Sequence, residues 1–128
     1  MNRSIRYPAA LAALLAVQAW SPMTHALGDS AFDFKTAADL IDVCSSDAQP
    51  AALACQAFLE ATIQYHDAIT DRKRMKPLVC YPRGTTVEQA RETFLAWGKK
   101  NAGDAQRMKE LPVVAVVRAL AEAHPCKR

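Results

Sequence analysis

Apolar residues recur at helical spacing in four segments of the chain. The first covers about residues 36–45, where they follow the i, i+3, i+4, i+7 pattern of one helix face: Ala37, Leu40, Ile41 and Cys44. Thr36 precedes this run and suits the N-cap position, while Asp39 places a negative charge in the first turn, where the helix dipole favours it. This pattern predicts a first helix.

The longest periodic segment covers about residues 50–69. Asp47 and Pro50 provide a start signal. A continuous stripe then follows at helical spacing: Cys55, Phe58, Leu59, Thr62, Ile63, His66 and Ile69. We expect a second helix here, followed by a basic loop with the sequence TDRKRMKP that ends at Pro77.

A third helix is predicted over about residues 86–98. Thr85 and Glu88 have the spacing of a capping box, and Thr86 and Gln89 repeat that spacing one residue later. The expected buried side is Val87, Ala90, Phe94 and Trp97. Gly98 and the polar run of residues 99–103 are expected to end this helix.

The last segment, about residues 112–124, is rich in valine and could form a short strand by propensity alone. Its apolar residues nevertheless keep helical spacing: Val113, Val116, Val117 and Leu120. Pro112 suits a first helical turn, so we expect a helix, with one more short turn over residues 104–110. The chain shows neither an alternating strand pattern nor a repeat, which predicts a small all-α bundle of about four helices.

The beginning of the chain has the features of a signal peptide. Arg3 and Arg6 precede an apolar run from Pro8 to Trp20, which is short for a membrane span, and residues 24–26 read Thr-His-Ala, like a cleavage site. A weaker site follows Val17-Gln18-Ala19, and a buried first helix is the simpler alternative. We expect residues 1–26 to be removed after Ala26, leaving residues 27–128 as a single periplasmic domain.

Charge excludes one class of partner. The chain has a formal net charge of +3, and loss of the signal peptide would remove two arginines and leave a value near +1. Nucleic-acid-binding domains usually carry a strong basic bias, so we expect no nucleic acid. No later apolar run is long enough for a membrane helix, so no insertion is expected after cleavage.

Four cysteines lie in the expected mature chain: Cys44, Cys55, Cys80 and Cys126. An even count in a small exported domain is typical of disulfides, and the spacings match no zinc motif. Three pairings are possible. Cys44 and Cys55 flank one short turn, which favours their pairing and leaves Cys80 for Cys126. We therefore interpret Cys80 as a cross-link rather than a nucleophile or metal ligand.

The remaining residues give little indication of a catalytic site. His66 lies on the apolar stripe of the second helix, so we interpret it as a histidine at the edge of the core. His124 lies near a helix end. Asp67 and Asp71 are one helical turn apart, which also fits a solvated face. No serine or cysteine has an evident activating base, so we expect no catalytic residue, metal or cofactor, and a binding protein rather than an enzyme.

One charged segment stands out. Four cations fall within a single loop: Arg72, Lys73, Arg74 and Lys76. Such a run is commonly just a solvated loop. The functional alternative is a contact site for an acidic partner surface, where the charges would mainly speed association.

The order of these motifs resembles the Rap1a/Tai family of immunity proteins, which protect bacteria against amidase effectors of type VI secretion. The resemblance covers about residues 36–128 and rests on four pieces in order: Leu40-Ile41-x-x-Cys44, Cys55-x-x-Phe58, Cys80-Tyr81-Pro82 before Thr85-Thr86-x-x-Gln89, and Ala119-Leu120 before Pro125-Cys126. Three features differ from many members of the family: Ala61, Gln64 and the longer basic loop of residues 71–76.

The resemblance implies an all-helical, disulfide-bonded periplasmic protein that binds a cognate cell-wall amidase effector and blocks its cleft. Several members form homodimers, so it implies a homodimer as well. For the blocking element, residues 70–76 are our first hypothesis and residues 98–104 the second. The main alternative function is a small periplasmic helical chaperone or stress protein, followed by a toxin or acyl-binding module.

Overall fold

The computed structural model describes residues 34–73 and 75–127, and the expected signal peptide lies outside them. The described part contains five helices: α1 (Ala37–Ser45), α2 (Gln49–Lys73), α3 (Val87–Asn101), α4 (Ala105–Met108) and α5 (Pro112–Ala123). An isolated antiparallel bridge joins Val79 to Pro125. The predicted all-α fold is confirmed, and the short α4 occupies the extra turn expected in residues 104–110.

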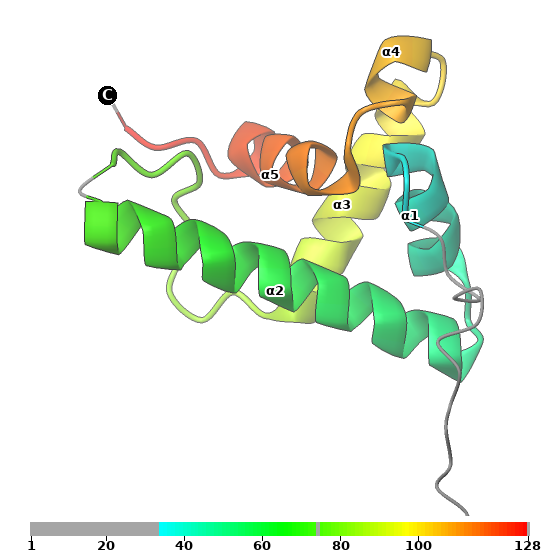
Figure 1. The fold of residues 1–128 in the computed structure, drawn as a ribbon, viewed down its shortest axis with the longest axis horizontal. Helices are drawn as coiled ribbons and strands as arrows, with labels where there is room; N and C mark the ends of the chain where they lie inside the picture. The colour runs from blue at the N-terminus through cyan, green and yellow to red at the C-terminus, as the bar shows by residue number, and fades with distance from the viewer. Residues whose placement is uncertain (1–33, 74, 128) are drawn as a thin grey trace, which may run out of the picture.

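The helices surround one core. The long α2 runs along the molecule, α3 crosses it, and α1 and α5 pack against both of these helices (Figure 1). The largest fully buried side chains come from four helices: Phe94, Leu40, Leu59, Leu120, Val116, Cys44 and Cys55. The predicted stripe of α2 faces this core, with Leu59 and Cys55 fully buried and Phe58 and Ile63 packed at its edge.

Capping boxes begin α1 and α3. At α1, the Asp39 N–H donates to Thr36 Oγ1 at 3.2 Å and the Thr36 N–H donates to the Asp39 carboxylate at 2.8 Å, so the predicted N-cap is confirmed. At α3 the cap is Thr86, which exchanges the same bonds with Gln89.

The predicted pair of Thr85 and Glu88 was therefore wrong by one residue. The physical reason is the tight turn before α3. Thr85 belongs to that turn, because both its N–H and its hydroxyl donate to the Pro82 carbonyl oxygen. Gly84 has a φ of 83°, a left-handed conformation that glycine adopts without a steric penalty.

Two helices run further than predicted. The second was expected to end at Ile69 but continues to Lys73, since no glycine or proline interrupts the chain before Pro77. The third continues through Gly98 to Asn101. Gly98 has a packing role instead of ending the helix, because a Cβ added there would lie 2.7 Å from Ile41 Cδ1 on α1. Much of each predicted loop is therefore helical.

The last segment is a helix, so the strand alternative was wrong, but its buried face differs from the predicted one. Buried positions are Pro112, Ala115, Val116, Ala119 and Leu120, while Val113 is 39% exposed. Small alanine side chains on this face allow α5 to pack close to its neighbours, and the bulkier Val113 and Val114 turn outward.

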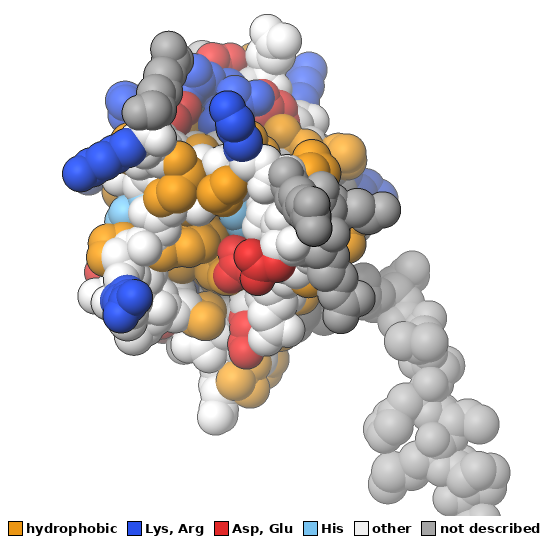
Figure 2. Space-filling view, turned by 90° about the vertical axis from the view of Figure 1, so that its left-hand side faces the viewer, with side chains coloured by type: hydrophobic (Ala, Val, Ile, Leu, Met, Phe, Trp, Pro, Cys, Tyr) orange, Lys and Arg blue, Asp and Glu red, His pale blue; other side chains and the backbone are white. Residues whose placement is uncertain are grey.

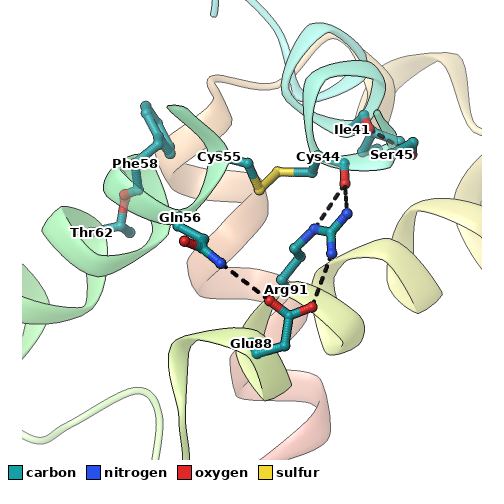
Figure 3. Close-up of a disulfide and its surroundings, with 9 residues drawn as sticks. All are labelled: Ile41, Cys44, Ser45, Cys55, Gln56, Phe58, Thr62, Glu88 and Arg91. Atoms are coloured by element: carbon teal, nitrogen blue, oxygen red, sulfur yellow. Dashed lines mark hydrogen bonds and ion pairs between the residues drawn. A yellow bond between two sulfur atoms is a disulfide. The ribbon is translucent and has the colours of Figure 1, made fainter. Parts of the chain in front are cut away.

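The predicted Cys44–Cys55 disulfide is confirmed and is fully buried between α1 and α2. Arg91 of α3 reaches the same place: its Nε and Nη2 donate to the Cys44 carbonyl oxygen at 2.9 and 2.7 Å, and its Nη1 donates to Glu88 at 2.9 Å (Figure 3). Gln56 of α2 donates to the same Glu88 carboxylate at 3.4 Å. Three helices are thus joined around one disulfide.

Candidate interaction surface

The chain between α2 and α3 is attached to the C-terminal residues. The predicted Cys80–Cys126 disulfide is confirmed. Beside it, the Cys80 N–H donates to the His124 carbonyl oxygen at 2.9 Å, and Val79 pairs with Pro125 while its side chain is buried in the core. Cys80 therefore has a structural role, as the sequence indicated. Residues 75–80, which we call the connecting segment, leave the end of α2 and are anchored at Cys80.

His66 forms a second attachment for the connecting segment. Its side chain is buried at 5% exposure, and its Nε2 accepts the Leu78 N–H at 3.2 Å. Its Nδ1 lies 3.0 Å from Asp67 Oδ1. The prediction of a histidine at the core edge agrees with this position. The bond to Leu78, twelve residues away, had no signal in the sequence because it depends on how the chain returns past α2.

Three of the four candidate cations lie at the end of α2 or in the connecting segment. The backbones of Arg72 and Lys73 form the last residues of α2, and Lys76 is exposed. Arg74 and the side chains of Arg72 and Lys73 lie outside what the structure describes. Asp71, in the same turn of α2, is also exposed.

An apolar groove lies next to the connecting segment. Its volume is about 410 Å³, and Leu78 and one face of α5 line it: Val114, Val117, Arg118, Ala121 and Glu122. Leu78 is 62% exposed and Met75 55%. Figure 2 faces this end of the molecule and shows hydrophobic side chains gathered in the middle of the face, with cations above and to the left and acidic groups beside them.

The charges at the groove already have partners. Arg118 donates to both carboxylate oxygens of Glu110, at 2.9 and 3.1 Å, and Arg107 lies 3.3 Å from Glu122. The groove therefore offers mainly apolar contacts to a partner surface.

The titratable groups nearby have structural partners. Asp67 pairs with His66. Tyr81 packs against His124 with ring centroids 5.9 Å apart. Burial, and then the negative charge of Asp67, raises the pKa of Tyr81 to about 12, which keeps its phenol neutral at ordinary pH.

Within residues 34–73 and 75–127, no cluster of three or more His, Cys, Asp or Glu residues could hold a metal ion, and both cysteine pairs are oxidised. None of the helices in this part of the chain is long and apolar enough to cross a membrane.

Comparison with known proteins gives one result. A family model described as Rap1a immunity proteins matches residues 36–126, which span all five helices and both disulfides. Searches of curated proteins and of solved structures found no match. The chain therefore belongs to the Rap1a immunity protein family, whose members give immunity to a type VI effector and act as inhibitors rather than enzymes.

Proposed function

We propose that this chain is a periplasmic immunity protein that binds and blocks a peptidoglycan amidase effector of a type VI secretion system. The observation that carries the proposal is the family match over residues 36–126. Family membership implies a cognate effector partner. The amidase as target comes from the resemblance of the sequence motifs.

The disulfides support the periplasm as the compartment. Both cysteine pairs are oxidised, and disulfides persist in oxidising compartments such as the bacterial periplasm. In this proposal residues 1–26 direct export and are removed after Ala26, leaving one domain over residues 27–128. N-terminal sequencing of the protein recovered from the periplasm tests this, and a full-length cytoplasmic product would contradict it.

The proposed mechanism is steric. The end of α2 and the connecting segment project from one end of the molecule (Figure 1) and are fixed at Cys80 by the disulfide and the bridge to Pro125. A rigidly based element of this kind loses little conformational freedom when it enters a cleft. The cations Arg72, Lys73, Arg74 and Lys76 would steer it toward an acidic rim. We also propose that the protein acts as a homodimer.

Co-purification from the native periplasm tests the partner. The tagged protein should recover one stoichiometric partner, a small secreted amidase, and the pair should survive high dilution. Recovery of many unrelated proteins, especially after acid treatment, would instead favour a helical chaperone. Sedimentation equilibrium of the purified protein tests the homodimer.

A further inference from the structure

His66 has both ring nitrogens engaged, and the partners define its protonation. Leu78 contributes a backbone N–H, which can only donate, so Nε2 accepts and carries no hydrogen. The proton of the neutral ring is then on Nδ1, which donates to Asp67 Oδ1 at 3.0 Å. The bond to Leu78 therefore exists only while His66 is neutral.

Beside the disulfide at Cys80 and the bridge of Val79 to Pro125, two backbone N–H groups of the connecting segment donate to acceptors of different chemistry. The Cys80 N–H donates to the His124 carbonyl, which does not titrate. The Leu78 N–H, two residues earlier, donates to an imidazole, which gains a proton in mildly acidic solution. Leu78 is the point where the connecting segment lines the groove and its side chain is exposed. Acid should therefore affect the bond next to the groove and leave the bond at Cys80 intact.

We propose that His66 is a positioning residue, which holds Leu78 in the binding-competent position and releases it when Nε2 is protonated. Recognition of the partner then weakens in acid. The release itself is a property of the isolated protein, whereas its effect on binding rests on the function proposed above.

Charged groups around His66 and Leu78 have structural partners. Asp67 is paired with Nδ1 of His66. Among the described residues, the other titratable or charged groups near this region include Tyr81 and His124 beside the C-terminal residues, Arg118 and Glu122 on α5 beside Leu78, and the exposed Asp71 and Lys76. Tyr81 is neutral here, and Arg118 and Glu122 have partners on Glu110 and Arg107. Protonation of Nε2 would place two donors, the ring N–H and the Leu78 N–H, against each other.

Amide hydrogen exchange of the purified, oxidised protein tests the release directly. Protection factors of Leu78 and Cys80, each corrected for the intrinsic effect of pH, are measured from pH 8 to pH 4.5. We expect Leu78 protection to fall about tenfold in acid, the scale of one lost hydrogen bond, while Cys80 stays constant. Constant Leu78 protection, absence of protection at any pH, or a parallel fall of both amides would overturn the proposal.

Two variants separate positioning from simple stability. His66→Gln can retain an acceptor that does not titrate, so its Leu78 protection should not depend on pH. His66→Leu removes the acceptor and should leave Leu78 unprotected throughout while Cys80 remains protected. If His66→Leu fails to fold, the wild-type profile still decides the matter.

Binding to the cognate effector is then compared at pH 7.5 and pH 5. Wild type should lose several-fold more affinity in acid than His66→Gln does. Equal losses would refute the link between His66 and recognition. Failure of the wild type to bind at either pH would instead contradict the proposed function and leave the exchange result standing.

Discussion

Arg91 donates two hydrogen bonds to the carbonyl oxygen of Cys44, a residue 47 positions earlier in the chain. Carbonyl groups in the last turn of a helix lack partners within the helix. The guanidinium of Arg91 supplies two donors to one such group at the end of α1, beside the Cys44–Cys55 disulfide. Arg91 of α3 therefore caps the C-terminal end of α1 and links the two helices at that point.

Arg91→Ala should lower the free energy of unfolding by about 1.5–3 kcal/mol, because hydrogen bonds that involve a charged group contribute about that much. Arg91→Lys should recover only part of the loss, since an ammonium cannot make the forked contact. Urea unfolding measures both. Arg118→Ala, which removes a more exposed ion pair with Glu110, is the control and should cost no more than about 1 kcal/mol. Equal losses at the two arginines would refute the capping role.

The sequence predicted the features that depend on neighbouring residues. Helical spacing located the four longer helices. The N-cap at Thr36 was predicted from Thr36 itself and from Asp39 three residues later. The Cys44–Cys55 pairing was predicted because one short turn separates the two cysteines. Features that depend on the packed structure were missed. Arg91 and Cys44 are too far apart in the sequence for any local pattern to connect them. The acceptor for the Leu78 N–H comes from an earlier helix. Gly98 was interpreted as the end of a helix, although it is the close approach of Ile41 that requires a residue without a side chain there.

Gly98→Ala should destabilise the protein by about 1 kcal/mol. The added methyl would lie 2.7 Å from Ile41 Cδ1, and overpacking of a core costs about 1–3 kcal/mol, partly offset by the higher helix propensity of alanine, worth about 1 kcal/mol. Combining it with Ile41→Val should cost less than the sum of the two single changes.

Gly103→Ala is the matched control for that experiment. A Cβ at Gly103 has no heavy atom within 4 Å, so this change should be neutral or stabilise by about 0.4–1 kcal/mol. Thermal unfolding of the four variants gives the comparison. If Gly98→Ala raised stability as Gly103→Ala does, the close approach of α1 and α3 would not constrain that position.

Loss of the second disulfide should weaken the protein strongly. Cys80→Ser should cost about 2–5 kcal/mol, the usual range for a native disulfide of a small secreted domain. Cys126→Ser should cost about the same, and the double variant should be no worse, because each change opens the same loop. Peptide mapping without reductant should recover Cys44–Cys55 and Cys80–Cys126, and a peptide joining Cys55 to Cys80 would refute the pairing.

The two disulfides should also differ in their response to mild reductant. Cys44 and Cys55 are fully buried, whereas Cys80 is exposed and Cys126 half-buried. Thiol attack depends on access to the sulfur, so Cys80–Cys126 should be reduced first. Alkylation and mass spectrometry at successive times would show the order, and prior loss of Cys44–Cys55 would contradict it.

Replacing Arg72, Lys73 and Arg74 together with alanine should slow association with the effector and reduce its dependence on salt, while the dissociation rate and folding change little. Stopped-flow or surface binding at low and high salt measures this.

The matched control removes three exposed cations elsewhere: Lys99, Lys100 and Lys109. If the control slows association and the first triple variant does not, the contact lies near residues 98–104, the second hypothesis. Unchanged rates in both would exclude steering by either group.

The central claim, that the protein inhibits an amidase effector, is tested most directly by peptidoglycan hydrolysis in vitro. Purified cognate amidase digests isolated peptidoglycan while the oxidised protein is added in increasing amounts. We predict that hydrolysis stops near one immunity chain per amidase, that an unrelated amidase is unaffected, and that the protein alone releases no product. Full amidase activity at a large excess of the protein, or hydrolysis by the protein itself that Cys80→Ala abolishes without unfolding it, would contradict the account.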